Sequence, residues 1–529
     1  MFYQVIKSQF KIISILLTIV ISVALFGCSN SHKSTDASSD TSSVTVSLPA
    51  TSEPEKGFDP INGWGAGEHM HDPLIQSTLV KNNDGEIKPD LATSWNLSDD
   101  ARQLTFKLRD DAVFSNGEKV KASDVAFTLT QLKNSVNTTA DLENVESIKA
   151  LSDTEVQIDL REPNNLLLYT LSYVGIVPEK YYSESYAKNP IGSGPYILTK
   201  YSVGEMAILE ANENYYAGTP SMKKVTVLFS EEDTSLNLAK SGEVDVAYTS
   251  ATYSTQSISG YQLTSCKAVD NRGISLPTNV ADNPVTSDLS VRRAMNYGCD
   301  KQSIIDHTLN GYGKVAYSVC DGMPWYSADM EFKSDIDKAK ELLETSGWKM
   351  NSSGYREKNG QICEVNLWYA AGDSLRQAMS YDFADQMKEI GIKVNLKSSS
   401  WDEIYQHQYT DLVFWGWGST TPLELYGILK SDSESNFAKY ANSIVDEHLK
   451  NAVETSDSDI SMNEFKLAQY DASQNSGVNV DTGASWIWLA NIDHLYFVRN
   501  GVDIGIQQLH PHGHGWSLLN NVSTWSKTK

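Results

Sequence analysis

Five of the ten histidines lie in two short clusters near opposite ends of the chain. The clusters are His69-Met70-His71 and His510-Pro511-His512-Gly513-His514. In an extended segment, side chains two residues apart point to the same side, so the three C-terminal histidines could converge on one ligand. Imidazole suits Ni, Cu and Zn, and we therefore expect a site for a transition metal or its chelate. Pro and Gly also mark loops, so a structural or surface role is the alternative.

A second candidate is Arg376. A strand expected at Glu364–Ala370 is followed by a helix that begins near Ser374, which places Arg376 in the first turn of the helix. Ligands of α/β proteins gather at the carboxyl ends of strands, and a helix N-terminus offers free N–H groups to an anion. A guanidinium at this place can bind a carboxylate through two hydrogen bonds. The alternative is a surface ion pair of Arg376 with Asp373 or Asp382.

Aromatic side chains form a third group of candidates, since the chain contains 12 Trp and 26 Tyr. Amphipathic aromatic residues often line surfaces that receive other molecules. In the run from Trp415 to Gly418, whichever of Trp415 and Trp417 faces a cleft could stack on a ligand. Trp401 and Tyr426 are further candidates for ligand contact. Packing of Trp415 and Trp417 in the core or at a hinge is the alternative.

Signatures of catalysis are missing from the sequence. It contains no Gly-x-Ser-x-Gly, no His-Glu-x-x-His and no P-loop motif. Gly192-Ser193-Gly194 lacks the dinucleotide-binding pattern and predicts a tight turn. We therefore expect neither an enzyme nor a required cofactor. A chain without a P-loop also cannot drive transport by ATP hydrolysis itself.

The N-terminal segment predicts export. Two lysines precede an apolar run from Ile12 to Phe26, which is the pattern of a signal peptide over residues 1–27. The run is shorter than the about 20 apolar residues that span a bilayer. The ending at Gly27-Cys28 resembles a bacterial lipobox, which implies a lipid on Cys28 and an extracytoplasmic protein anchored to the membrane. The Ser-rich residues 28–43 predict a flexible tether.

Length and composition predict a folded chain with at least two globular units. The chain has 529 residues, of which 40% are hydrophobic and 21% are charged. The net charge of −24 opposes binding to a phosphate backbone, so nucleic acid is not an expected partner. Free thiols and one or two disulfides both remain open for the four cysteines beyond the tether, namely Cys266, Cys299, Cys320 and Cys363.

The elements that must position these candidates are mixed α and β. Alternation predicts strands at Val44–Leu48, Leu104–Leu108, Thr154–Leu160, Tyr196–Lys200 and Lys224–Phe229. Ser123 is expected to cap a helix that continues to Leu132. After about residue 275 the pattern becomes α/β. Helices are expected at Asp335–Ser346 and Ser374–Ile390, and strands at Glu364–Ala370, Ile392–Lys397 and Asp411–Trp415. Helix-rich sequence follows from Ala441 to Ala472, and strand-like sequence from Trp486 to Val498.

Several separated motifs carry a family resemblance. They are Asp90 to Trp95, Leu104 to Asp111, Phe114 to Glu118, Ala122 to Val125, Gly192 to Tyr196, Val291 to Met295 with Asp300, Lys338 to Lys340 with Leu343 and Gly347, and Ile390 to Ile392. In this order they resemble family 5 of the bacterial extracellular solute-binding proteins, which serve ABC importers of peptides and nickel. The resemblance covers nearly the whole chain beyond the tether.

The resemblance implies an α/β protein with a two-lobed fold of the type II periplasmic-binding kind and an extra subdomain in the first lobe. Lobe I would hold residues 44–274 and 485–529, with the extra subdomain near 63–188, and lobe II would hold residues 275–484. The two chain crossings would form a hinge that lets the lobes close on a ligand. The ABC permease and the ATPase would be separate chains. Both histidine clusters would belong to lobe I and could meet.

The identity of the ligand stays open at this stage. Peptide-binding relatives often place an acidic residue directly after the Trp-Gly of this strand, whereas here no acid follows Trp415 before Glu424. Nickel-binding relatives place a His after this Trp, but none lies between His407 and His448. An oligopeptide or dipeptide is the first expectation, and nickel or another transition-metal chelate is the alternative. A lipid-anchored sensor or adhesin would have the same signal and tether, so it is a further alternative.

Overall fold

The computed structural model describes residues 40–66, 70–136, 140–513 and 515–528. Residues 41–529 form one compact unit. The predicted signal peptide, Cys28 and nearly all of the tether lie outside the described residues, as do His69 and His514. No helix in the described ranges is both long enough and apolar enough to cross a membrane.

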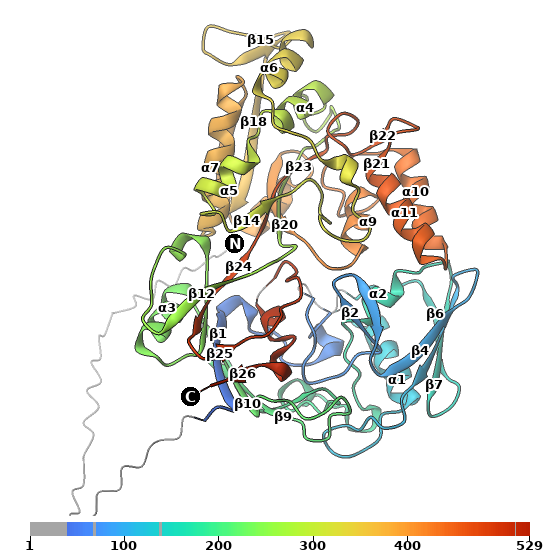
Figure 1. Cartoon of the computed structure of the whole chain (residues 1–529). Coiled ribbons are helices and arrows are strands. Elements are labelled where there is room, and N and C mark those ends of the chain that lie inside the picture. Colours follow the sequence, from blue (N-terminus) through green and yellow to red (C-terminus); the bar gives the residue numbers. More distant parts are fainter. Residues whose placement is uncertain (1–39, 67–69, 137–139, 514, 529) are drawn as a thin grey trace, which may run out of the picture. The chain divides into compact units, whose positions relative to one another are not determined.

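The first lobe is built on a seven-stranded mixed sheet with the order β12-β24-β11-β1-β10-β9-β8 (Figure 1). Its strands are β1 (Ser43–Pro49), β8 (Tyr196–Ser202), β9 (Met206–Ala211), β10 (Lys224–Ser230), β11 (Val246–Thr249), β12 (Tyr261–Cys266) and β24 (His494–Arg499). β1 runs parallel to β10 and β11, and the other pairs are antiparallel. Val44, Val46 and Leu48 of β1 are buried, which is the period of two that predicted this strand.

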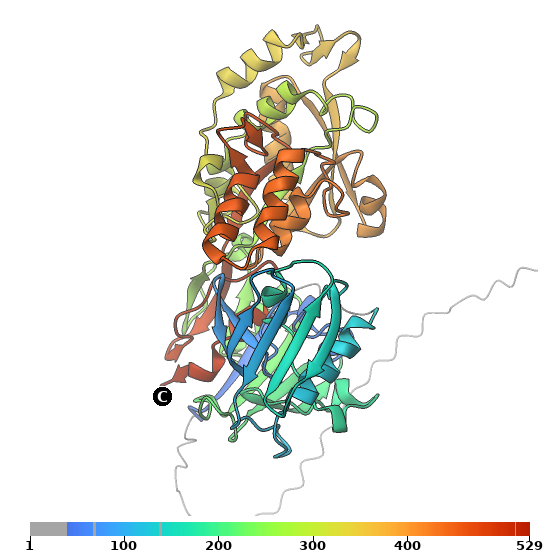
Figure 2. The same ribbon diagram turned by 90° about the vertical axis from the view of Figure 1, so that its right-hand side faces the viewer.

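An additional subdomain of this lobe contains an antiparallel sheet with the order β4-β5-β7-β6 (Figure 2). Its elements are β4 (Ala92–Leu97), β5 (Gln103–Leu108), α1 (Ala122–Lys133), β6 (Val145–Ala150), β7 (Glu155–Leu160) and α2 (Leu167–Leu171). The prediction that Ser123 caps α1 is wrong, because Lys121 is the N-cap residue. The carboxylate of Asp124 accepts a hydrogen bond from the backbone N–H of Lys121 at 2.9 Å. An acid at the third helical position therefore fixes this start.

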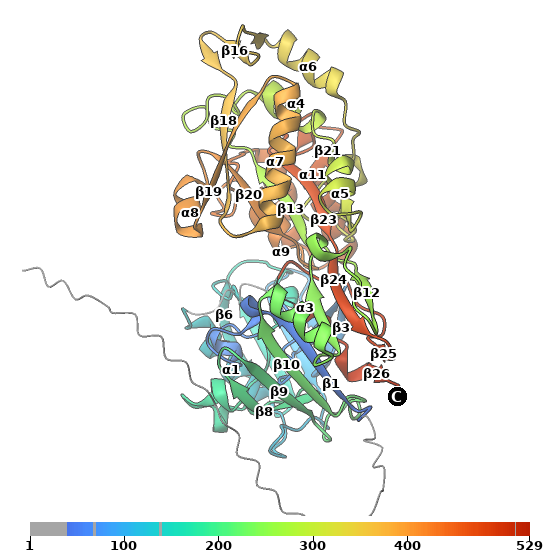
Figure 3. The same ribbon diagram turned by 90° about the vertical axis from the view of Figure 1, so that its left-hand side faces the viewer.

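The second lobe is built on a six-stranded sheet with the order β14-β23-β13-β20-β18-β19. Its strands are β13 (Asn271–Ser275), β14 (Gly313–Val315), β18 (Glu364–Ala370), β19 (Lys393–Ser399), β20 (Leu412–Trp417) and β23 (Trp486–Ile492). The helices are α4 (Leu289–Tyr297), α5 (Lys301–His307), α6 (Ile336–Thr345), α7 (Ser374–Glu389), α8 (Trp401–His407), α9 (Leu423–Leu429), α10 (Ser443–Glu454) and α11 (Ser458–Gln469). α7 packs on β18 and β19 (Figure 3). Gly347 and Gly391 follow α6 and α7 with φ of +94° and +84°, as expected of helix-ending glycines.

The chain crosses between the two large sheets at two places. The first crossing runs from β12 to β13, and the second lies at Asp493 between β23 and β24. The stretch Trp486–Val498, expected to be strand-like, is thus two strands that belong to different sheets. We propose the division into lobes at 274/275 and 484/485 for the domains. Nearly all of β13 and the whole of β23 lie on the first-lobe side of these limits, although both strands belong to the second sheet.

The four described cysteines are free thiols, and all of them are buried. Burial raises the pKa of Cys266, Cys299 and Cys363 to about 12. A thiol with such a pKa carries almost no thiolate at neutral pH, so these residues pack as small apolar side chains. Of the two alternatives that the sequence left open, free thiols or disulfides, the structure therefore shows free thiols.

Candidate ligand-binding site

Two buried arginines meet beside Gly416 in the middle of the six-stranded sheet. Arg272 on β13 lies directly opposite Gly416 on β20, and Arg376 approaches from the first turn of α7. A methyl group on Gly416 would lie 2.5 Å from Nη2 of Arg376 and 3.0 Å from Nη1 of Arg272. It would also lie 2.6 Å from Cε1 of His512. The missing side chain at position 416 therefore lets two guanidinium groups and an imidazole approach one point.

Two carboxylates balance these arginines. Asp270 forms an ion pair with Arg272 and contacts Nδ1 of His512 at 2.6 Å and Nε2 of His494 at 2.9 Å. Burial opposes ionisation of Asp270, but the Arg272 guanidinium and the two histidine contacts outweigh it and hold the pKa of Asp270 well below its usual range. Arg376 pairs with Asp373 in the same way. Asp270 is thus ionised at neutral pH although it is buried.

Each arginine retains a donor for a further partner. Arg272 is 7% exposed and Arg376 is 9% exposed. The Nε–H groups of both are buried and have no acceptor among the described residues. An unpaired buried donor costs free energy, so these atoms are suited to an acceptor that arrives with a ligand. A carboxylate offers the geometry that a guanidinium prefers.

The predicted position of Arg376 is confirmed. It lies in the first turn of α7, where its backbone N–H donates to the Asp373 carboxylate at 2.8 Å. The alternative pairing with Asp373 is also present, with Arg376 buried and Asp373 half-buried. Asp382 instead accepts a hydrogen bond from Thr308. The local β-strand and helix unit was enough to place this side chain.

The aromatic candidates divide into two kinds. Trp415 is buried, stacks on Phe437 with ring centroids 4.2 Å apart and donates from Nε1 to Ser275 at 3.0 Å, as a core residue does. Trp417 is half-buried and its Nε1–H has no acceptor among the described residues. The guanidinium of Arg376 lies 5.5 Å from the ring centre of Trp401. Trp401 therefore borders Arg376, whereas the Trp417 ring packs beside Trp415 and Phe437.

Tyr426 and Glu424 lie on α9, which follows the Trp-Gly run. Tyr426 is half-buried beside Lys430, whose Nζ is 5.8 Å from the ring centre. The Glu424 carboxylate turns back and accepts a hydrogen bond from the backbone N–H of Gly418 at 2.8 Å. Burial raises the pKa of Glu424 to about 7. An acid thus lies next to the Trp-Gly run in space although none follows directly in sequence.

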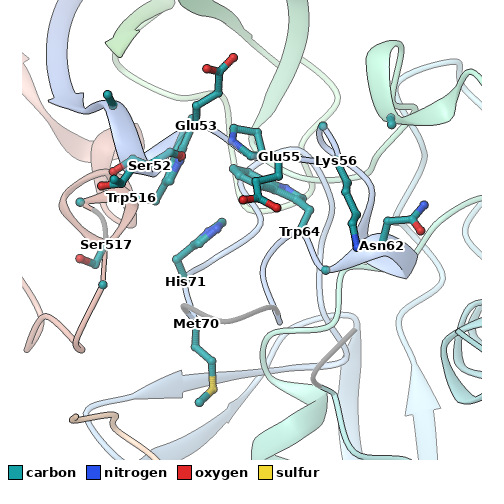
Figure 4. A pocket seen from close by; sticks show the side chains of 18 of the residues that line it. Ser52, Glu53, Glu55, Lys56, Asn62, Trp64, Met70, His71, Trp516 and Ser517 are labelled. Carbon is teal, nitrogen blue, oxygen red and sulfur yellow. The ribbon is translucent and has the colours of Figure 1, made fainter. Parts of the chain in front are cut away.

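A cavity of about 920 Å³ in the first lobe is lined by His512 together with residues of the N-terminal and C-terminal segments (Figure 4). Trp64, His71 and Trp516 form an aromatic wall, with the Trp64 ring centre 4.4 Å from that of His71 and 4.9 Å from that of Trp516. Ser52 also lines it, and neither the Trp64 Nε1–H nor the Ser52 hydroxyl has a partner among the described residues. His512 lines the cavity, and its Nδ1 lies 3.2 Å from Nη1 of Arg272, so this side chain lies between the cavity and the arginine pair.

The histidine clusters are only partly brought together. His71 and His512 line the same cavity, and burial lowers the pKa of His71 to about 4. His510 is buried and contacts His494, with the two Nδ1 atoms 3.2 Å apart. Within the part of the chain that the structure describes, no three His, Cys, Asp or Glu side chains are arranged to hold a metal ion.

Asp270, Arg272 and His494 were not found from the sequence. They lie at the two chain crossings and converge through the pairing of β13 with β20 and β23. The available signal was the pair of charges, Asp270 and Arg272, at the start of a strand whose five residues are all buried. Buried charges of this kind are uncommon unless they are paired or functional.

The comparisons with known proteins agree with this architecture. The sequence model of "Bacterial extracellular solute-binding proteins, family 5 Middle" matches residues 86–438, which is more than half of the chain. The chain belongs to this family. The family resemblance inferred from the sequence motifs is therefore confirmed, and so is the two-lobed type II fold with mixed α and β.

Three relatives illustrate the family. The nickel-binding periplasmic protein of Escherichia coli K12 is 31% identical over 382 residues, which cover 66% of this chain and 72% of that protein. The oligopeptide-binding protein AppA of Bacillus subtilis 168 is 26% identical over 419 residues, covering 73% and 76%. The crystal structure of NikZ from Campylobacter jejuni in complex with Ni(L-His) superimposes with a TM-score of 0.75 at 25% identity and covers 92% of this chain and 100% of that one.

Proposed function

We propose that this family 5 protein captures a small solute that carries a carboxylate and delivers it to an ABC permease. The permease and the ATPase are separate chains, and the protein itself is neither an enzyme nor dependent on a cofactor. The observation that carries the proposal is the pair of buried arginines whose guanidinium groups meet beside Gly416 and whose Nε–H donors have no acceptor among the described residues. A peptide ends in a carboxylate, and an amino-acid chelate of nickel carries one as well.

A short oligopeptide or a dipeptide is the first candidate. The cavity beside His512 has room for several residues, and its Trp64 and Ser52 donors match the carbonyl oxygens of a peptide backbone. Trp516 and His71 add flat surfaces on which a side chain can stack. The likeness to an oligopeptide-binding relative supports this ligand.

A nickel chelate is the second candidate, because His71 and His512 lie in the cavity wall. A chelate brings most of its own ligands, so it needs only one or two imidazoles and a partner for its carboxylate. Two nickel-binding relatives support this candidate, and one of them is solved with a histidine chelate. His69 and His514 remain part of the proposed metal contacts.

We also propose that Cys28 carries a lipid that holds the protein at the outer face of the cytoplasmic membrane. The support is the signal-peptide pattern ending at Gly27-Cys28 and the extracellular character of the family. A sensor or adhesin would share this anchor, but it would not need a buried site that binds the carboxylate of a solute. Genes for two permeases and an ATPase beside the gene of this protein would favour import.

Mass spectrometry of material released on denaturation identifies the ligand most directly. Calorimetry then compares a tripeptide, Ni²⁺ alone and Ni²⁺ with L-histidine on the wild type and on Arg376→Ala. Arg293→Ala is the matched control, since this arginine pairs with Asp481 in the same lobe away from the site. Equal affinity of wild type and Arg376→Ala for every ligand that binds would overturn the carboxylate site. A His510/His512/His514→Ala variant separates the two candidates, because only the nickel chelate should lose affinity through lost metal contacts.

A further inference from the structure

Among the described residues, the second lobe does not itself supply donors for all of the last carbonyl groups of its helix α10. The helix ends at Glu454, and Thr455 continues in extended conformation with no glycine turn. The last four carbonyl groups of any helix lack partners inside the helix. At this end, Ser461 of α11 donates to the carbonyl of Ala452 at 2.7 Å. The other donors to this helix end, among the described residues, come from the additional subdomain of the first lobe.

A single residue of that subdomain, Asn165, supplies these donors. Its side-chain amide donates to the carbonyl of Ala452 at 2.7 Å and to that of Thr455 at 2.9 Å. Its backbone N–H donates to the carbonyl of Val453 at 3.0 Å. Three carbonyl groups at the end of one helix are thus satisfied by one residue from the other lobe. Figure 2 shows α10 and α11 next to the four-stranded sheet of the subdomain.

The loop that presents Asn165 is held in place by its own neighbours. The backbone N–H of Asn164 donates to the carbonyl of Ala101 at 3.0 Å, and the Asn164 side chain accepts from the N–H of Leu166 at 2.8 Å. Leu166 is 4% exposed and packs in the hydrophobic cluster of the second lobe rather than of its own. The loop therefore carries both a polar cap and an apolar anchor to the same surface.

A second contact between the same two parts lies closer to the arginine pair. Thr420, just after β20, accepts a hydrogen bond from the Asn82 amide on its carbonyl at 2.7 Å, and its hydroxyl is 2.9 Å from the Tyr173 hydroxyl. All three side chains are buried. Separation of the lobes at this face would expose Leu166 and leave the α10 carbonyls and these hydroxyl groups without their partners.

We propose that Asn165 is a latch residue, which caps α10 across the lobes only when the protein is closed and thereby stabilises the closed form. The latch is on the subdomain side, opposite the chain crossings at Asp270 and Asp493, so it acts where hinge opening separates the lobes most. Its effect on ligand affinity follows from closure, because stabilising the binding-competent form lowers the apparent Kd. The inference does not depend on which solute binds.

The test exchanges the amide of Asn165 for a carboxylate of the same shape. Asn165→Asp replaces the donor with an acceptor that faces two carbonyl oxygens. The matched control is Asn144→Asp, because the Asn144 amide donates to the carbonyl of Glu162 inside the subdomain and forms no hydrogen bond with a described residue of the second lobe. Small-angle scattering gives the radius of gyration, and hydrogen exchange by mass spectrometry reports the peptides that contain Leu166 and Thr420. Both measurements are made on the purified protein, with and without Ni²⁺ and L-histidine or a tripeptide.

We expect Asn165→Asp to have a larger radius and roughly tenfold faster exchange at Thr420, with a matching rise in Kd for whichever probe binds. Thr420 lies on the other lobe and does not contact Asn165, so a merely local loosening of the loop leaves its exchange unchanged. Asn144→Asp should match the wild type in radius and in exchange at Thr420. Equal radii and equal exchange in wild type and Asn165→Asp, or equal effects of the two variants, would overturn the proposal. The comparison of ligand-free proteins decides the matter even if neither probe binds.

Discussion

Arg376→Ala is the substitution whose effect follows most directly from the site. The guanidinium is 9% exposed, its Nε–H has no acceptor among the described residues, and Nη2 points to the space above Gly416. A hydrogen bond to a charged group contributes about 1.5–3 kcal/mol. If the ligand carboxylate accepts from this arginine, its loss should raise Kd by roughly 10- to 150-fold.

The variant must be distinguished from one that folds poorly. Asp373 loses its ion pair, but its carboxylate still accepts the backbone N–H of residue 376 and so still caps α7. Burial opposes ionisation of Asp373, while Arg376 and Arg272 lower its pKa, so the variant retains part of this stabilisation through Arg272. We expect a melting temperature a few degrees lower and a protein that is folded at room temperature. Thermal unfolding followed by circular dichroism checks this point.

The assay is isothermal titration with the ligand that mass spectrometry identifies. Arg376→Lys should give an intermediate Kd, because it keeps the charge but loses the planar pair of donors. Arg293→Ala should bind like the wild type. An unchanged Kd for Arg376→Ala in a folded protein would refute the reasoning and leave Arg376 as a structural partner of Asp373.

Three further predictions follow from other residues. Burial raises the pKa of Glu424 from 4.5 to about 7, so between these values the native state binds more protons than the unfolded state and the free energy of unfolding should fall as pH rises. Glu424→Gln should remove about 1–3 kcal/mol of this fall. Identical pH profiles of wild type and variant in urea unfolding would contradict the assignment. Trp64→Phe removes the Nε1–H, which has no acceptor among the described residues, together with part of a buried ring, so Kd should rise by about threefold to tenfold and the melting temperature should fall, whereas unchanged titration curves would show that the ligand does not reach this wall. Cys28→Ser should release the protein from membranes on cell fractionation, because a single thiol carries the proposed anchor, and continued retention in the membrane fraction would count against it.

The sequence predicted the second lobe well because its elements are local. β18, α7 and the glycine that ends α7 follow from periodicity, an Asp cap and a left-handed glycine within one stretch of chain. Arg376 was found for this reason. Ser123 was misjudged because Ser and Asp compete for the same helix start, and the carboxylate of Asp124 satisfies the first N–H group instead.

The rest of the site depends on pairings between distant segments. Asp270 meets His494 and His512 only because β13 and β24 follow the two crossings and the segment at His510 pairs with Ala268. No periodicity within one segment encodes this contact. The role of Gly416 also depends on distant segments, because the space that a side chain at this position would occupy is taken by Arg272, Arg376 and His512. Glu424 returns to Gly418 through the turn into α9, which the spacing of the two residues did not reveal.

The central claim is that Arg272 and Arg376 receive a carboxylate of the solute beside Gly416. A crystal structure of the protein with the ligand that it retains through purification, or with the best binder from calorimetry, tests this claim most directly. We predict a carboxylate oxygen within hydrogen-bonding distance of Nε or Nη2 of Arg376 or of Nε of Arg272, with the remainder of the ligand extending past His512 toward Trp64. A ligand bound elsewhere, or one whose carboxylate contacts neither arginine, would contradict the account.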